Sequence, residues 1–235
     1  MTPFSEALGL AFKLVFTGDE ALYSAVALSL RVSITATAVA CFLGFLIGGL
    51  LAVKRFTGRS IVIAALNSLM GLPPVVVGLV VYLYLSRSGP LGFLGLLYTP
   101  TAMIIAQTLL ILPIVAAMSR QVLEDLHLEY DEQFRSLSLT SRETVQAILW
   151  EGRFALVTVA LAGLGRAIAE VGAVMIVGGN IDNLTRVMTT AIALETSRGD
   201  LPLAMALGIV LLTLALVLNA AVQGLRETTY RASHV

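Results

Sequence analysis

The chain has 235 residues, of which 57% are hydrophobic and only 13% are charged, and its formal net charge is zero. Soluble domains carry about 25% charged residues, and the mean hydropathy of +0.91 points the same way. This composition excludes an ordinary soluble domain, gives no indication of nucleic-acid binding, and predicts a polytopic, all-α membrane protein.

The N-terminal segment 1–20 has no basic region ahead of its apolar part, and it contains Glu6. Secretory signal peptides begin with positive charge and end at a cleavage site. We therefore expect this segment to remain in the protein as a helix lying near the membrane surface. A sixth, short membrane span over residues 4–16 is left open.

Five segments are apolar over about 20 residues, the length that a membrane-spanning helix needs. These expected spans are 24–53, 61–85, 101–118, 154–177 and 203–222. They predict a single membrane domain over 1–235 with a helical core at 24–222, and no appended soluble domain.

Positive charge is distributed unevenly between the two sets of connections. One side receives nine Lys and Arg residues and the other receives four. The richer set is Lys54, Arg55, Arg59, Arg120, Arg135, Arg142, Arg153, Arg226 and Arg231. The positive-inside rule makes that side cytoplasmic, which predicts an N-terminus outside and a C-terminus inside.

Several kinds of chemistry are missing from the sequence. A phosphate-binding loop of the G-x-x-x-x-G-K-[ST] type needs Ser or Thr after its lysine, and neither Lys13 nor Lys54 meets this requirement. Both histidines, His127 and His234, lie outside the expected spans, and no cluster has metal-ligand spacing. We expect no cofactor and no enzymatic activity within the membrane.

The second span contains "GLPPVVVG", with Pro73 and Pro74 in succession. Two prolines remove two amide donors and bend or break a helix. In a membrane the carbonyls that they free need partners from neighbouring helices or from water in a cavity. A harmless kink would explain the pair, but we favour a place on a transport pathway.

The connection 119–153 is a polar, predicted cytoplasmic segment. Its apolar residues recur at helical spacing, at Leu126, Tyr130, Phe134 and Leu137. Thr140 precedes Glu143 by three residues, the spacing of a capping box, and so predicts that a second helix starts near residue 141. We expect two amphipathic helices joined by a bend.

This helical pair has two interpretations. It is either a solvated hairpin that packs on its own membrane domain or a docking surface for a cytoplasmic partner. In the second case Phe134 and Leu137 form the apolar tip, and Glu132 and Arg135 lie beside them at the rim.

The fourth span carries Arg166 and Glu170, whose i,i+4 spacing places them on one helical face. Charges inside a membrane usually face a bundle interior or water, so the pair is either structural or in contact with a transported ion. The outer loop 178–202 follows, and residues 185–197 are expected to form a short helix. Its expected apolar face is Leu184, Val187, Met188 and Ala191.

The polar connection resembles the "EAA" loop of ABC-importer permeases, whose pattern is E-A-A-x-x-x-G-x(9)-I-x-L-P. The corresponding residues here are Glu132, Gln133, Phe134, Ser138, Ile148, Trp150 and Glu151. The resemblance implies ATPase docking through Glu132, Gln133, Phe134, Arg135, Leu137 and Ser138. Because serine replaces glycine, we expect a bend without left-handed backbone. Because Glu151 replaces proline, we expect the second helix to run uninterrupted toward Phe154.

"LPPVVVGLVVYLYLSRSGPLG" and "GRAIAEVGAVMIVGGNIDNLTRVMTTAIALE" closely resemble bacterial tungstate-importer permeases, with molybdate and sulfate permeases as more distant relatives. The resemblance implies the type I ABC-importer fold, a homodimer, a separate ATPase subunit and an extracytoplasmic oxyanion-binding protein. It also implies alternating access in the cytoplasmic membrane. The prolines and charges within the spans, Pro73, Pro74, Arg166 and Glu170, are the pathway or gate candidates. An ATP-independent secondary transporter or channel and a membrane scaffold protein are the alternatives of another class.

Overall fold

The structure is a computed structural model that describes residues 3–17 and 20–232, and its regular secondary structure over these ranges is entirely helical. The helices are α1 (Pro3–Phe16), α2 (Glu20–Val53), α3 (Arg59–Leu69), α4 (Pro74–Leu85), the short 3-10 helix η1 (Gly92–Leu94), α5 (Pro100–Glu129), α6 (Asp131–Ser136), α7 (Ser141–Glu151), α8 (Arg153–Ile168), α9 (Gly172–Gly178), α10 (Met188–Arg198) and α11 (Leu201–Ala232). The all-α class is confirmed. Residues 1–2 and 18–19 of the expected N-terminal helix, and His234, lie outside the described residues.

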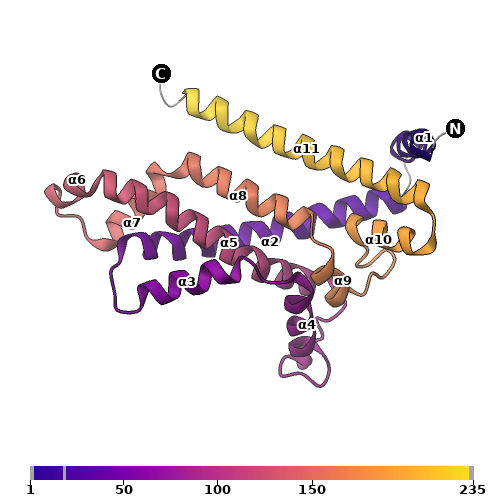
Figure 1. Cartoon of the computed structure of the whole chain (residues 1–235), viewed down its shortest axis with the longest axis horizontal. Coiled ribbons are helices and arrows are strands. Elements are labelled where there is room, and N and C mark those ends of the chain that lie inside the picture. The colour runs from indigo at the N-terminus through magenta and orange to yellow at the C-terminus, as the bar shows by residue number, and fades with distance from the viewer. Residues whose placement is uncertain (1–2, 18–19, 233–235) are drawn as a thin grey trace.

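Two long helices, α2 and α5, pack against each other at the centre of the bundle (Figure 1). Small residues on α2 let the two backbones approach, because a Cβ added at Gly44 would lie 2.7 Å from Cγ1 of Val115. The Ser119 hydroxyl on α5 donates to the Gly44 carbonyl at 3.1 Å. The same hydroxyl lies 3.2 Å from the Ala116 carbonyl, so this buried polar group has acceptors on both helices.

The other helices are arranged around this pair. Helix α8 packs on both α2 and α5, and α3 runs along α5 (Figure 1). One buried cluster links α2, α5 and α8 through Ala36, Ala40, Ile111, Val115, Val159 and Ala167. Helix α11 contacts α1 and α10 at one end of the bundle, and much of its surface is exposed.

The five expected spans are the upper limit of what the helices allow, and they differ from the helices in continuity. Among the described residues three helices are long and apolar enough to cross a membrane, and up to five spans result if each bent helix pair counts as one. The second expected span is α3 and α4, bent by 101°. Helix α1 has 14 residues, about 21 Å at 1.5 Å per residue, which is short of a hydrocarbon layer of about 30 Å.

The expectation of a continuous fourth span over 154–177 is wrong. Helix α8 ends at Ile168 and α9 begins at Gly172. No proline marks this break in the sequence. The intervening backbone is held by tertiary hydrogen bonds, described below, that local sequence patterns do not reveal.

The polar connection also differs from the expected helical pair. Helix α5 continues past residue 118 to Glu129, and the predicted stripe is divided between α5 and the short α6. The bend at Tyr130 turns Phe134 toward the bundle, where it packs near the buried cluster of Ala52, Leu123, Ile148 and Leu156. The first of the two expected helices is therefore divided at Tyr130, and its second part, α6, packs Phe134 against the bundle.

The outer loop contains the expected short helix, observed as α10. Of the residues expected on one face, Val187, Met188 and Ala191 are buried, whereas Leu184 is 49% exposed. The Val187 amide donates to the Thr190 hydroxyl at 3.1 Å, which closes the first turn of α10. This turn lies directly against the break in the fourth span.

Candidate functional site

The first candidate region lies where two interrupted spans meet. Pro73 caps α4 and Pro74 is its first helical residue, so neither proline removes a hydrogen bond from the helix interior. The Pro73 carbonyl accepts from the amides of Val76 and Val77 at 3.0 and 3.3 Å and so begins the hydrogen-bond ladder of α4. The predicted break at the two prolines is confirmed.

The start of α4 packs against the start of α9 with almost no space between the backbones. A Cβ added at Gly78 would lie 2.7 Å from Cα of Ala173, and one added at Gly172 would lie 2.9 Å from Cγ2 of Val75. The α3–α4 break and the α8–α9 break are therefore adjacent. Interrupted spans of this kind are a pointer to ligand pathways in transporters.

Arg166 and Glu170 form an ion pair beside these breaks, with Nη1 of Arg166 2.5 Å from Oε2 of Glu170. The Glu170 side chain is 3% exposed and that of Arg166 is 33% exposed. The other carboxylate oxygen, Oε1, accepts from the Ala173 amide at 3.0 Å. Glu170 thus neutralises an arginine and also satisfies a free amide at the start of α9.

Two further side chains hold the α8–α9 break, and the sequence reasoning missed both. Gln107 on α5 donates through Nε2 to the Ala167 carbonyl at 3.1 Å, and the Thr189 hydroxyl donates to the Glu170 carbonyl at 2.8 Å. Both side chains are buried. Gln107 is a polar residue within an apolar run. Polar residues inside a membrane span usually face the bundle interior and are paired, so its position could have identified it.

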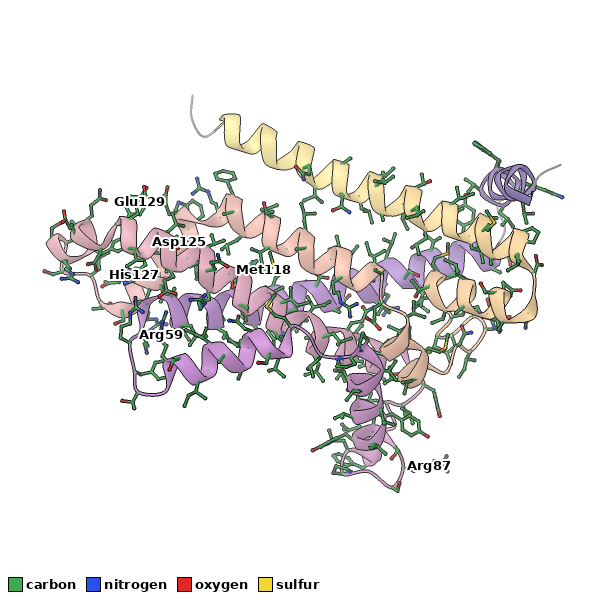
Figure 2. The ribbon with its side chains drawn as sticks, in the orientation of Figure 1. Arg59, Arg87, Met118, Asp125, His127 and Glu129 are labelled. Atoms are coloured by element: carbon green, nitrogen blue, oxygen red, sulfur yellow. The ribbon has the colours of Figure 1, made fainter. Side chains whose placement is uncertain are left out.

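A second feature that sequence reasoning missed is a shared carboxylate at the opposite end of the bundle. Glu124 accepts through Oε1 from Arg55 at 3.1 Å and from Arg59 at 2.7 Å, and through Oε2 it pairs with Arg120. Arg59 also donates through Nε to the Leu51 carbonyl at 2.8 Å. This cluster joins α3 and the loop after α2 to α5, and Figure 2 shows Arg59 at the same end as His127.

The predicted capping box at the start of α7 is confirmed. The Glu143 amide donates to the Thr140 hydroxyl at 3.4 Å, and the Thr140 amide and hydroxyl donate to Glu143 Oε2 at 2.8 and 2.6 Å. Hydrogen bonds from the Thr140 side chain and backbone lower the pKa of Glu143. Because the folded pKa lies below the unfolded one, the stabilisation is present above the unfolded pKa and is lost as the pH falls through the folded pKa.

The candidate docking residues lie on α6 and in the turn that follows it, apart from the helix breaks. Leu137 is 69% exposed. Phe134, in contrast, is half-buried, with its ring centroid 6.0 Å from that of His127 and 6.0 Å from that of Tyr130. The exposed members of the set are Glu132, Gln133, Arg135, Leu137 and Ser138. The apolar tip is therefore Leu137, and Phe134 anchors the loop to α5.

Two local expectations for this loop are wrong. Ser138 has φ +53°, so the bend does use the left-handed backbone although glycine is replaced. The hydrogen bond from the Leu139 amide to the Phe134 carbonyl, at 3.1 Å, closes the turn around it. Glu151 does not let the helix run straight on, because the chain turns by 74° between α7 and α8 where Gly152 packs against α5.

The left-handed serine leads to a prediction. Replacing Ser138 by valine should destabilise the loop by about 1–2 kcal/mol, because a β-branched side chain crowds the backbone at positive φ, whereas Ser138→Gly should be tolerated. Thermal unfolding of the purified protein would measure both. Ser136→Val is the matched control, since Ser136 lies in α6; an equal loss there would contradict the prediction.

Two interrupted helices that meet at their breaks, together with a helical loop at one end of the bundle, are typical of a membrane transport subunit. The family model described as "Binding-protein-dependent transport system inner membrane component" matches residues 41–228. The chain belongs to this family, and it is a multi-pass protein of the inner membrane.

Named relatives extend the comparison over nearly the whole chain. The chain is 41% identical over 227 residues to the tungstate uptake system permease protein TupB of Peptoclostridium acidaminophilum, covering 97% of this chain and 100% of the relative. It is 42% identical over 213 residues to a probable anion ABC transporter permease protein of Haloferax volcanii, covering 88% and 92%. It is 29% identical over 191 residues to the sulfate transport system permease protein CysT of Salmonella typhimurium, covering 78% and 69%.

Proposed function

We propose that this chain is the permease subunit of an ATP-driven importer that moves tungstate across the cytoplasmic membrane. The observation that carries the proposal is the end-to-end similarity to a tungstate uptake permease, at 41% identity over 97% of the chain. The sulfate permease is the more distant relative, at 29% identity over 78% of the chain. Tungstate is therefore favoured over sulfate, and molybdate is the second candidate because it has the same charge and shape.

In the proposed transport cycle one end of the bundle binds the ATPase, and the helix breaks form the gate. ATP closes a pair of separate ATPase subunits, which move α6 and α7 on the cytoplasmic face. The movement reaches the adjacent helix breaks, where Pro73, Pro74, Arg166 and Glu170 form the gate. An extracytoplasmic binding protein delivers the oxyanion, with the N-terminus outside and the C-terminus inside as the distribution of positive charge favours.

A second copy of the chain completes the pathway in this proposal. Arg166 lies 13 residues into α8, about 20 Å along it, and one third of its side chain is exposed. A guanidinium at that depth is unfavourable against lipid. The exposed part of Arg166 therefore faces the partner copy or the aqueous pathway between the two copies.

Transport in liposomes tests the function. Permease reconstituted with its ATPase and binding protein should accumulate tungstate only when ATP is present. Movement of tungstate by the permease alone would favour a secondary transporter or channel, and no movement under any condition would favour a scaffold. Competition with molybdate and sulfate in the same liposomes ranks the substrates.

Docking of the ATPase gives a separate prediction. Replacing Leu137 by glutamate should weaken ATPase binding by about 2 kcal/mol or more, roughly thirtyfold, because it places a charge at the exposed apolar tip. Co-purification of the ATPase with the tagged permease measures the loss. Leu128→Glu is the control, since Leu128 is 63% exposed on α5 outside the proposed surface. Undiminished co-purification with Leu137→Glu would exclude this tip as the docking point.

A further inference from the structure

The corner between α7 and α8 is a fixed change of direction. The two helix axes differ by 74°, and Gly152 lies buried at the turn. A Cβ added at Gly152 would lie 3.0 Å from atoms of both Leu123 and Leu126 on α5. On one side of the corner α7 carries polar, exposed residues, and on the other side α8 is apolar. The corner therefore marks where the chain enters the membrane.

Trp150 occupies this corner and is 71% exposed. It is the one tryptophan of the chain. Its indole N–H makes no hydrogen bond within the part of the chain that the structure describes. A large apolar ring with a free donor suits the boundary between hydrocarbon and headgroups, where tryptophan is enriched.

Arg153 is held beside this ring in a defined position. Its guanidinium carbon lies 4.8 Å from the centroid of the Trp150 ring and 4.5 Å from that of the Phe154 ring. Nη1 donates to the Trp150 carbonyl at 2.7 Å, which leaves other N–H donors of the guanidinium available. Two aromatic contacts orient the arginine, and a planar guanidinium is well suited to hydrogen-bond a phosphate.

We propose that the α7–α8 corner binds the headgroup of a phospholipid in the cytoplasmic leaflet. The Trp150 indole lies in the interface, and Arg153 donates to the lipid phosphate. The ATPase is a less suitable partner for this ring, because the proposed docking residue Leu137 precedes the N-terminal end of α7, whereas Trp150 lies at its C-terminal end. That helix has 11 residues, about 16 Å. The exposed carboxylate of Glu151 adjoins the site and offsets the charge of Arg153, so the lipid is recognised through donor geometry more than through net charge.

Fluorescence of the native tryptophan tests this proposal directly. The full-length permease is placed in nanodiscs of phosphatidylcholine brominated either near the glycerol end or near the methyl end of its acyl chains. Bromine near the glycerol end should quench Trp150 more strongly, and added ATPase should leave the emission unchanged. Absence of quenching by either lipid, or an emission shift caused by the ATPase, would overturn the proposal.

Two control variants calibrate the depth, both in a Trp150→Phe background. Leu128→Trp places the reporter at the exposed cytoplasmic end of α5 and should be quenched by aqueous iodide but not by bromine. Leu216→Trp places it on the exposed face of α11, 71% exposed, and should be quenched most by bromine near the methyl end. In Arg153→Gln with native Trp150, the preference for shallow bromine should be lost, and an unchanged depth profile would overturn the role of Arg153.

Discussion

Glu170→Gln should lower the stability of the folded permease by about 3 kcal/mol, because removing one partner of a buried ion pair leaves the other charge without compensation. The uncompensated group is Arg166, whose side chain is two-thirds buried. Glutamine retains an oxygen that can accept from the Ala173 amide, so the change isolates the loss of charge. Thermal unfolding of the purified protein and the amount of permease in membranes measure the effect.

The double variant Arg166→Gln, Glu170→Gln separates a structural pair from a transport residue. With both charges removed, most of the lost stability should return, because no unpaired charge remains. If Arg166 acts on the pathway, the double variant folds but transports tungstate slowly. Uptake at the rate of the unmodified permease would show that the pair is structural only, and failure of the double variant to regain stability would contradict the assignment of an ion pair.

Gly78→Ala should separate α4 from α9 and abolish most of the uptake. The added Cβ would lie 2.7 Å from Cα of Ala173, and backbone atoms on both sides cannot yield without moving a helix. Overpacking of this kind typically costs about 1–3 kcal/mol. Uptake into cells, compared at equal permease levels, gives the functional loss, and thermal unfolding gives the loss of stability.

Gly208→Ala provides the matched control for that substitution. Gly208 lies in α11, and a Cβ there would meet no atom within 4 Å. Alanine should therefore stabilise the helix by up to about 1 kcal/mol. If Gly78→Ala behaves like Gly208→Ala, the close approach of the two helix breaks is not needed for transport.

Features encoded by residues near one another in sequence were the predictable ones. Thr140 and Glu143 interact across three residues, and the two adjacent prolines break a helix through their own covalent structure, so spacing and residue type were sufficient. Composition and apolar segments likewise predicted an all-α membrane protein with five spans, and the structure allows three to five.

Features that depend on distant partners were not predictable from local patterns. The α8–α9 break is stabilised by Gln107, 60 positions from its acceptor in sequence, and by Thr189, 19 positions away. The left-handed Ser138 likewise depends on the packing of Phe134 against α5. A residue pattern indicates the local conformation that a segment prefers. The conformation at these positions is instead determined by tertiary contacts with residues distant in sequence.

Helix α5 has a mechanical consequence for the proposed transport cycle. It carries Gln107, which holds the helix break, and His127, which stacks on Phe134 of the docking loop. These residues are about 30 Å apart along one helix at 1.5 Å per residue. For a rigid helix, a tilt of about 5° about its His127 end would displace Gln107 by roughly 2.6 Å, enough to break its hydrogen bond to Ala167. Pro113 lies within α5 between these two residues and removes one backbone hydrogen bond of the helix. Helix α5 would therefore transmit the proposed movement of the ATPase to the gate as a lever with a proline between its two ends.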